Sequence, residues 1–403
     1  MDTKKSLYAR YSAFTVFFYI SLSLSNYISV YLNENGFTGT QIGAIMSVSS
    51  LAAAVSLPVW GIVSDKLGSA RKTMAVCIAI YATFFFLVPR TLQTAVGPIF
   101  LGVIFIVVSR SFTGPCNHLA VGWTVRQTSL NGINYSSVRL WGSIGFAVMM
   151  MILSFVMPHT GTSVIFYLVP ASAACVIVPF FSVKENTLEE QKVRVKDLKP
   201  GRVLKNYYFM TYLVMVVGMV VYDSLTAVYM PFLVESVGAS TTSTALILGV
   251  RCLFEMIAML AAVRIKKRVP LPYLLIAAGA MITAEHMLYG SVGSLTGILL
   301  VTVLSGYANG TYLGLGPSYV YSIIPPELNN TAQTICGSVA MATAIAGSFI
   351  GGVLIDKIGV RDLFFGCGFM ILAIIIFFTV SLVTGRKVFG GETPRSVFMP
   401  IDK

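Results

Sequence analysis

The sequence has little charge and few of the residues that build soluble active sites. Only 11% of its 403 residues are Asp, Glu, Lys or Arg, whereas soluble domains usually carry about 25%. Its mean hydropathy is +0.81, so an ordinary soluble enzyme is excluded. The six cysteines lie singly inside apolar segments, a spacing that suits neither a metal cluster nor a disulfide framework. The first apolar run begins near Tyr8 and lacks a small-residue cleavage site, so no cleavable signal peptide is expected.

The sequence also lacks a polar stretch long enough for a separate catalytic domain. No nucleophile–base pair, metal cluster or phosphate-binding loop is legible in it, so we expect neither an enzyme nor a bound cofactor. The formal net charge of +12 would suit a nucleic-acid partner. The basic residues, however, fall in short clusters between apolar runs and not on one soluble face, so nucleic-acid binding is not expected.

Long apolar runs dominate the chain instead. About 20 apolar residues at about 1.5 Å each cross a hydrocarbon layer of about 30 Å, and strands of a membrane β-barrel would be about 10 residues long and alternate in polarity. The runs therefore predict an all-α membrane protein with twelve transmembrane helices. Their approximate ranges are 8–33, 39–63, 71–90, 96–122, 134–157, 162–182, 207–234, 241–264, 270–290, 295–323, 331–355 and 362–384.

The longest polar stretch divides these spans into two sets of six. We expect an N-terminal six-helix bundle (1–183), a cytoplasmic linker loop (184–206), a C-terminal six-helix bundle (207–385) and a cytoplasmic tail (386–403). The Lys and Arg residues between the spans lie on the same side of the membrane as the N-terminus, except for Arg90, Lys357 and Arg361. This bias predicts cytoplasmic N- and C-termini in a multi-pass protein of the inner, cytoplasmic membrane.

A loop signature between the second and third spans points to a family. It contains Gly61, Asp65, Lys66, Gly68 and Arg71. Here Gly68 permits a tight turn, Asp65 can face a neighbouring helix N-terminus, and the basic residues hold the loop in the cytosol. The pattern resembles the loop signature of the major facilitator superfamily (MFS). The resemblance implies a transporter with two pseudo-symmetric six-helix bundles.

The same pattern recurs after the eleventh span as Gly352, Asp356, Lys357, Gly359 and Arg361. A recurrence on the opposite face is expected of a fold built from inverted three-helix repeats. On the fourth span, the sequence from Arg110 to Gly114 resembles an Arg-x-x-x-Gly signature of the superfamily, although Thr113 stands where Gln is common. That resemblance implies a role in proton coupling for Arg110.

The fifth span carries the most informative resemblance. Arg139, Trp141, Gly142, Gly145 and Phe146 are similar in spacing to the fifth span of the lactose-permease-like branch of proton symporters, which includes nucleoside and phenylpropionate carriers. The resemblance implies that Arg139 binds substrate hydroxyls and that Phe146 stacks on a sugar ring. The loop from Pro325 to Gln333 resembles the same branch, so the resemblance covers nearly the whole chain.

This branch also has a carboxylate on the fourth span, and the present chain has none there. Asn117 and His118 occupy the expected neighbourhood, which weighs against recognition of the lactose type. We include both as candidate substrate-binding residues. For His118 there are two alternatives: a role in solute binding or proton coupling, or no such role in a hydrated histidine whose hydrogen bonds are all made.

Ionisable residues inside apolar spans are candidates for a proton pathway, because a charge in hydrocarbon costs about 2.5–3.5 kcal/mol. Arg251 and Glu255 lie four residues apart on the eighth span and share a helix face. A change in their separation would switch the protonation of Glu255, and a permanent structural ion pair is the alternative. Asp223 on the seventh span has a coupling or a structural role. We predict that Glu285 and His286 lie on a solvated outer rim.

Tyrosine and asparagine residues recur on the first and tenth spans, where they can offer neutral hydrogen bonds and stacking surfaces to a solute. About half of them are expected to belong to interfacial belts. The residues that we include as substrate-binding candidates are Asn26, Tyr27, Asn309 and Tyr312.

Together these features predict a proton-coupled symporter that imports a small polar organic solute, most readily a sugar or glycoside, by alternating access. The alternatives are a proton-driven antiporter that exports drugs or metabolites, and an importer of nucleosides or aromatic acids. The expected partners are the solute, protons and the lipid bilayer, with the proton gradient as energy source. We expect a monomer.

Overall fold

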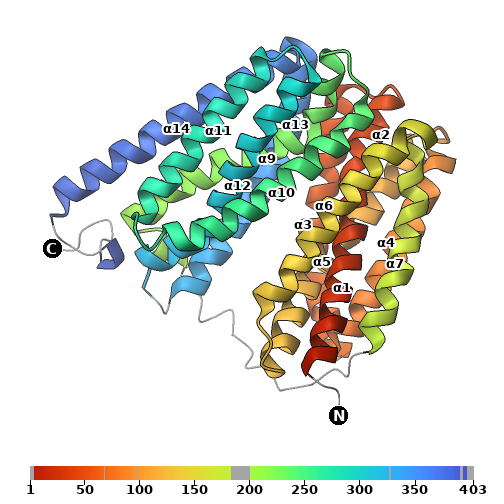
Figure 1. Cartoon of the computed structure of the whole chain (residues 1–403), viewed down its shortest axis with the longest axis horizontal. Coiled ribbons are helices and arrows are strands. Elements are labelled where there is room, and N and C mark those ends of the chain that lie inside the picture. Colours follow the sequence, from red (N-terminus) through yellow and green to blue (C-terminus); the bar gives the residue numbers. More distant parts are fainter. Residues whose placement is uncertain are drawn as a thin grey trace. The chain divides into compact units, whose positions relative to one another are not determined.

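The structure is a computed structural model that describes residues 4–67, 69–97, 99–182, 200–325, 328–390 and 394–396. It forms two compact units, Met1–Leu188 with Ser240–Cys252, and Glu189–Ala239 with Leu253–Lys403. The boundary therefore passes through one helix, α10. Figure 1 labels the helices of both units.

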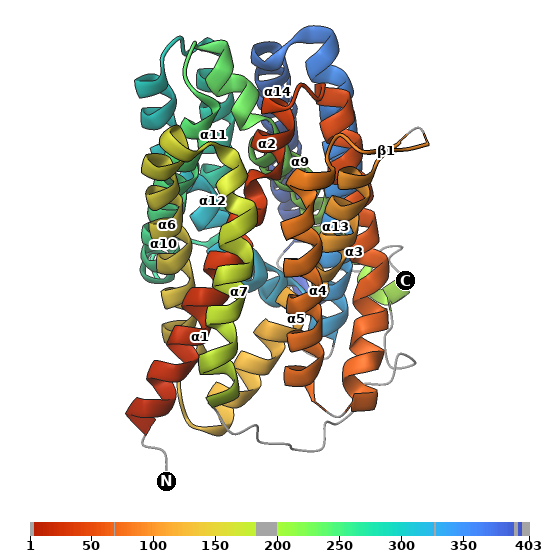
Figure 2. The ribbon, with the colours of Figure 1, turned by 90° about the vertical axis from the view of Figure 1, so that its right-hand side faces the viewer.

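The first unit is a helical bundle with a small hairpin. Its helices are α1 (Lys4–Leu24), α2 (Ile28–Glu34), α3 (Gly39–Leu67), α4 (Ala70–Thr91), α5 (Leu101–Leu130), α6 (Tyr135–Thr160), α7 (Ile165–Ser182) and the first part of α10 (Thr244–Ile265). Helix α1 packs on α6 and α7, and α5 packs on α3 and α4. Figure 2 shows α1, α7, α4 and α5 running along one another.

The second unit holds the rest of α10 and the later helices. These are α8 (Pro200–Val203), α9 (Tyr207–Ser236), α11 (Leu271–Ser291), α12 (Leu295–Ile323), α13 (Asn329–Ile358) and α14 (Val360–Val388). Helix α11 lies beside α12 and α14, and α9 lies beside α13 and α14 (Figure 1). A short 3₁₀ turn, η6 (Pro394–Ser396), follows α14.

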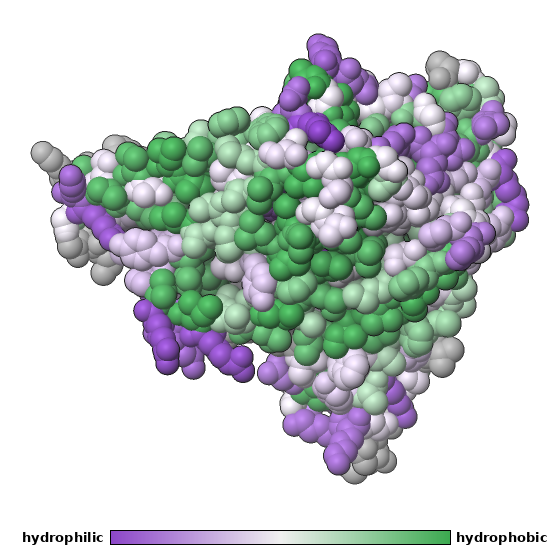
Figure 3. All heavy atoms as spheres, turned by 45° about the horizontal axis from the view of Figure 1, so that its top comes forward, coloured by the Kyte–Doolittle hydropathy of each residue, from purple (hydrophilic) through white to green (hydrophobic). Residues whose placement is uncertain are grey.

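Within the described residues, eleven helices are long and apolar enough to cross a membrane. Helix α5 is equally long, with 30 residues, but is not among them; it carries Arg110, Asn117 and His118. Large apolar side chains are exposed along the helices, for example Phe155 and Leu300, and Figure 3 shows hydrophobic residues as continuous areas. Such surfaces suit lipid contact. The multi-pass helical architecture is confirmed, and the count of twelve stays a prediction.

Two predicted spans differ from the structure. The span 8–33 is not one helix, because a 3₁₀ segment, η1 (Ser25–Tyr27), separates α1 from α2. The span 96–122 begins later, at Leu101, because a short antiparallel hairpin precedes it: β1 (Ala95–Val96) pairs with β2 (Ile99–Phe100). Most of the predicted linker 184–206 lies outside the described residues.

Both loop signatures lie where one long helix ends and the next begins. In the first, α3 ends at Leu67 and the Ser69 hydroxyl caps α4 by accepting from the Lys72 backbone N–H at 3.2 Å. Gly68 lies outside the described residues. In the second, Gly359 separates α13 from α14 with φ of +82°. That backbone conformation favours glycine.

Candidate functional site

The break in the first transmembrane segment is braced by side chains from two other helices. In this 3₁₀ turn the Ser25 carbonyl accepts from the Ile28 backbone N–H, and a carbonyl oxygen can accept a second hydrogen bond. The Arg110 guanidinium on α5 donates to the Ser25 carbonyl at 3.4 Å, and the Tyr81 hydroxyl on α4 donates to the Ser21 carbonyl at 3.1 Å. Arg110 is therefore placed against the break in α1.

The two candidate residues in this break have opposite surroundings. The side chain of Asn26 is exposed. Tyr27 is fully buried, and its hydroxyl has no hydrogen-bond partner among the described residues. An interrupted helix with an accessible amide is the kind of element that forms solute sites in transporters.

A close approach between α1 and α6 positions Arg139. Gly142 on α6 has no side chain, and a Cβ there would lie 2.5 Å from Cδ2 of Tyr19. Gly145 likewise faces the backbone of Val16, whose carbonyl oxygen would lie 3.0 Å from an added Cβ. The two glycines let α6 lie against the Tyr19 ring, and the Arg139 guanidinium carbon then sits 3.9 Å from that ring's centroid.

Arg139 is held by neutral groups. Its Nη1 donates to the Ser143 hydroxyl one turn later at 3.0 Å, and the Tyr19 ring attracts its charge through a cation–π contact. A guanidinium has five N–H donors. Those not given to Ser143 can reach oxygens of a solute, which is the chemistry expected of a hydroxyl-binding arginine.

The remaining candidates of the first unit lie on α5, α6 and α10. Phe146 is half-buried one turn beyond Gly142, and His118 is exposed on α5. Asn117 is half-buried, and its Oδ1 atom has no hydrogen-bond partner among the described residues. Arg251 is buried in the part of α10 that belongs to this unit.

In the second unit, Glu255 of α10 meets α12. The Asn309 side-chain amide donates to Oε2 of Glu255 at 2.9 Å. The neighbouring residue, Gly310, lies so close to the Glu255 backbone carbonyl and the Ala258 side chain that a Cβ would collide with both. The glycine thus allows the approach that brings the amide to the carboxylate. Sequence reasoning named Glu255 and Asn309 for different roles, and the structure brings them together.

Tyr312 lies on the same helix, α12, in contact with α9. Its hydroxyl is a hydrogen-bonding partner of Tyr212, and Asp223 of α9 is near enough to interact electrostatically with it. Gly316 leaves room for the Tyr212 hydroxyl, which would lie 2.6 Å from an added Cβ. Asp223 itself is exposed. Sequence reasoning missed Tyr212, because a tyrosine in an apolar run has no distinguishing local pattern.

The predicted solvated rim at Glu285 and His286 is wrong. Both side chains are fully buried on α11. The His286 ring packs against Tyr222 and Phe364, with centroids 5.0 and 5.2 Å apart. The prediction used only their position along the helix, whereas α9 and α14 supply the rings that cover His286.

The assembled groups are suited to binding and proton exchange. The described residues contain no group of three or more His, Cys, Asp or Glu side chains arranged for a metal ion. The first unit offers a guanidinium beside an aromatic ring. The second offers the Glu255 carboxylate bonded to an amide and, as a separate contact, the hydrogen-bonded hydroxyls of Tyr212 and Tyr312. Such groups form hydrogen bonds with a polar solute and accept or release a proton.

Comparison with protein families and curated proteins gives a consistent result. The profile of the MFS_1 like family matches residues 8–365. The maltose permease of Geobacillus stearothermophilus is 25% identical over 94% of this chain and 93% of its own length. The sucrose permease of Escherichia coli is 29% identical over 36% of each chain.

Solved transporter structures have a similar fold. The nucleoside transporter NupG aligns with a TM-score of 0.79 at 16% identity over 93% of this chain and 99% of that one. A D-xylose–proton symporter aligns with a TM-score of 0.71 at 13% identity, covering 92% of this chain and 96% of the other. At these identities the likeness concerns the fold.

Proposed function

The chain belongs to the MFS_1 like family of membrane transporters, and from this premise we propose that it is a proton-coupled symporter importing a small polar solute. A sugar or glycoside is the favoured class. The maltose and sucrose permeases among its relatives support that class. In this proposal the chain is a monomer with twelve spans in two six-helix bundles (1–183 and 207–385), a cytoplasmic linker and tail, and both termini inside the cytoplasmic membrane.

The observation that carries the proposal is the hydrogen bond from Asn309 to Glu255. The Glu255 carboxylate accepts this hydrogen bond from a neutral amide inside an apolar helix, where an ionisable side chain is a candidate proton carrier. We assign proton coupling to Glu255 together with Asp223, Arg251 and Arg110. Protonation of Glu255 would weaken its acceptor role and release the Asn309 amide toward the solute.

Solute recognition is assigned to the first unit and to α12. Arg139 supplies charged donors and rests on Tyr19. Phe146 supplies an apolar ring face, and Asn26, Tyr27, Asn117, His118 and Tyr312 supply neutral or weakly basic polar groups. Hydroxyl-rich solutes match this set, because they accept and donate hydrogen bonds and present a ring face for stacking.

Reconstitution into proteoliposomes tests the proposal. With an acidic outside medium and a labelled disaccharide, we expect accumulation that a protonophore abolishes. Glu255→Gln is expected to lose uphill accumulation, while the matched control Glu235→Gln, at the exposed end of α9, retains it. Solute efflux driven by the same inward proton gradient would instead support an antiporter. Accumulation that does not depend on the pH difference would contradict proton coupling.

A further inference from the structure

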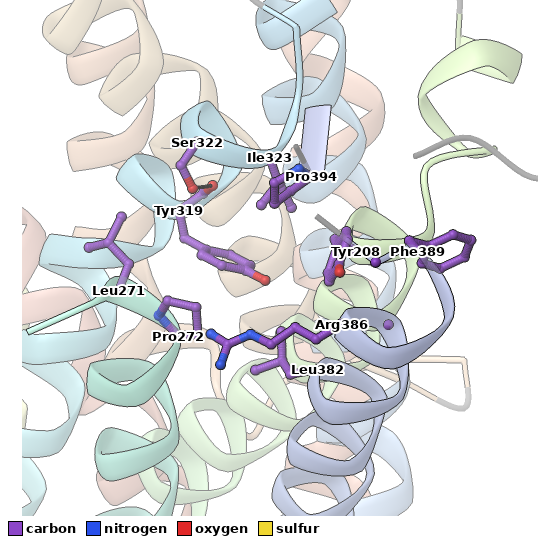
Figure 4. Close-up of a pocket in the computed structure, with 12 residues that line it drawn as sticks. Tyr208, Leu271, Pro272, Tyr319, Ser322, Ile323, Leu382, Arg386, Phe389 and Pro394 are labelled. Carbon is purple, nitrogen blue, oxygen red and sulfur yellow. Dashed lines mark hydrogen bonds between the residues drawn. The ribbon is translucent and has the colours of Figure 1, made fainter. Parts of the chain in front are cut away.

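A separate cavity lies at one end of the second unit, where α9 and α11 begin and α12 and α14 end. It has a volume of about 490 Å³. Tyr208, Leu271, Tyr319 and Arg386 line it, each from a different helix, and Pro394 of η6 closes one side (Figure 4). None of these residues belongs to the proposed transport site. On the proposed topology this end faces the cytosol.

Arg386 brings a positive charge to the cavity. Its Nη1 donates to the Tyr273 hydroxyl at 2.9 Å, which holds the side chain across the mouth between α14 and α11. Figure 4 shows the guanidinium beside Pro272, below the Tyr319 ring. The charge is near enough to interact with the hydroxyls of both Tyr208 and Tyr319.

Tyr319 supplies a buried donor. Its side chain is 2% exposed, its hydroxyl has no hydrogen-bond partner among the described residues, and Figure 4 shows that hydroxyl pointing into the cavity. Its ring is held by Tyr212 and Phe378, with centroids 5.1 and 6.0 Å away. Buried hydroxyls normally have a hydrogen-bond partner, so the Tyr319 hydroxyl is suited to bond a ligand in the cavity.

The surroundings favour a negative ligand. The first turn of α11, which includes Leu271 and Pro272, presents the positive end of a helix dipole. The last carbonyls of α12, which would repel an anion, are occupied. Arg395 donates to the carbonyls of Tyr321 and Ser322 at 3.1 and 3.3 Å.

The segment that bears Arg395 is fixed in place from a third helix. The Asn206 side chain, at the start of α9, donates to the Pro394 carbonyl at 2.9 Å. The cavity wall formed by η6 is thus part of the folded unit. The remaining lining is largely apolar, with Leu271, Ile323, Leu382 and Phe389.

We propose that this cavity binds a phosphate-bearing anion, with the phosphate between Arg386 and the Tyr319 hydroxyl. The phosphate would come from an anionic phospholipid or from a soluble phosphorylated metabolite. Basic pockets between transmembrane helices on the cytoplasmic side take up lipid headgroups, and the apolar walls suit a ligand that is partly hydrocarbon. A ligand bound in the cavity would contact the ends of four helices and η6.

Binding to the purified full chain in detergent tests the proposal without any transport assay, so its outcome is independent of the proposed symport. The lipid probe is dioctanoyl phosphatidylglycerol, with zwitterionic dioctanoyl phosphatidylcholine as its control. Glucose 6-phosphate is the soluble probe, with glucose as its control. Affinity is measured by native mass spectrometry and by ligand-dependent thermal stabilisation.

Three variants locate the site. Tyr319→Phe removes one oxygen that has no hydrogen-bond partner among the described residues, so the variant is expected to fold, and it should weaken binding of the phosphate probe about tenfold. Arg386→Gln should weaken it at least as much, because a charged donor is lost. Lys387→Gln removes the same charge from the next, exposed residue, which does not line the cavity, and should leave affinity within about twofold.

The two probes distinguish the source of the phosphate. Preference for phosphatidylglycerol over phosphatidylcholine supports a lipid ligand, and preference for glucose 6-phosphate over glucose supports a soluble one, provided that Tyr319→Phe and Arg386→Gln weaken the binding. The proposal is overturned if neither phosphate probe binds more tightly than its control. It is also overturned if binding survives both variants unchanged.

Discussion

Asn309 on α12 donates a hydrogen bond to the carboxylate of Glu255 on α10 over 2.9 Å, and Gly310 next to it permits the two helices to approach. The pair couples a proton-accepting group to a neutral donor that can also bind a solute hydroxyl. Transport coupling in this account depends on competition between those two roles of the amide.

Removal of that amide is expected to slow proton-driven uptake. Asn309→Ala deletes a hydrogen bond to a charged group, worth about 1.5–3 kcal/mol, so uptake should fall by about tenfold to a hundredfold. Thr311→Ala serves as the control, because the Thr311 hydroxyl lies on the same helix and donates to the Tyr307 carbonyl one turn earlier. Equal initial rates of labelled-sugar uptake in the two variants would argue against the proposed pairing.

A methyl group on α6 should disturb the Arg139 site. Gly142→Ala places a Cβ against the Tyr19 ring, and overpacking of this kind costs about 1–3 kcal/mol. We expect a lower melting temperature and a higher KM for uptake. Gly122→Ala on α5, where an added Cβ meets nothing within 4 Å, should change neither. An unaltered KM in a folded Gly142→Ala protein would show that Arg139 is not placed by this contact.

Arg110 is expected to be needed for the interrupted helix. Arg110→Leu removes the charged donor from the Ser25 carbonyl, which keeps its bond from the Ile28 backbone N–H, and loss of a hydrogen bond from a charged group costs about 1.5–3 kcal/mol. Arg110→Lys keeps a charged donor and should retain more stability. Thermal unfolding in detergent measures both effects. The coupling role proposed for Arg110 is tested by the number of protons transported per solute. A changed ratio in Arg110→Lys, at an unchanged melting temperature, would support that role.

Asn206 should stabilise the end of the second unit. Its side chain accepts from the Phe209 backbone N–H at 2.9 Å as the cap of α9, and donates to the carbonyls of Ile323 and Pro394. Loss of a cap alone costs about 0.5–2 kcal/mol, so Asn206→Ala should lower the melting temperature clearly. Asn206→Asp keeps the acceptor that caps α9 but loses the two donated hydrogen bonds. Its melting temperature should therefore lie between those of Asn206→Ala and the natural protein. Indistinguishable unfolding of all three proteins would contradict this role.

Much of the architecture could be predicted from run lengths, because a helix in lipid must satisfy its own backbone and therefore shows in the sequence as a long apolar segment. The second loop signature also placed a glycine at position 359, where the structure has a positive φ that favours glycine. The break at Ser25–Tyr27 was not predicted. The segment contains neither proline nor glycine to mark it, and its contacts with Tyr81 and Arg110 come from other helices.

The candidate residues were predictable only one at a time. An embedded carboxylate such as Glu255 stands out in an apolar run, but the identity of its partner depends on which helices pack together. The burial of Glu285 and His286 was missed for the same reason: depth along α11 does not reveal that Tyr222 and Phe364 cover the imidazole ring.

In the proposed mechanism an inward proton gradient drives solute accumulation through Glu255. The most direct measurement is labelled-disaccharide accumulation in proteoliposomes with an acidic exterior, for the natural chain and for Glu255→Gln, together with exchange of solute at equal concentrations on both sides. We expect uphill accumulation only in the natural chain and exchange in both. Full uphill accumulation by Glu255→Gln would contradict it.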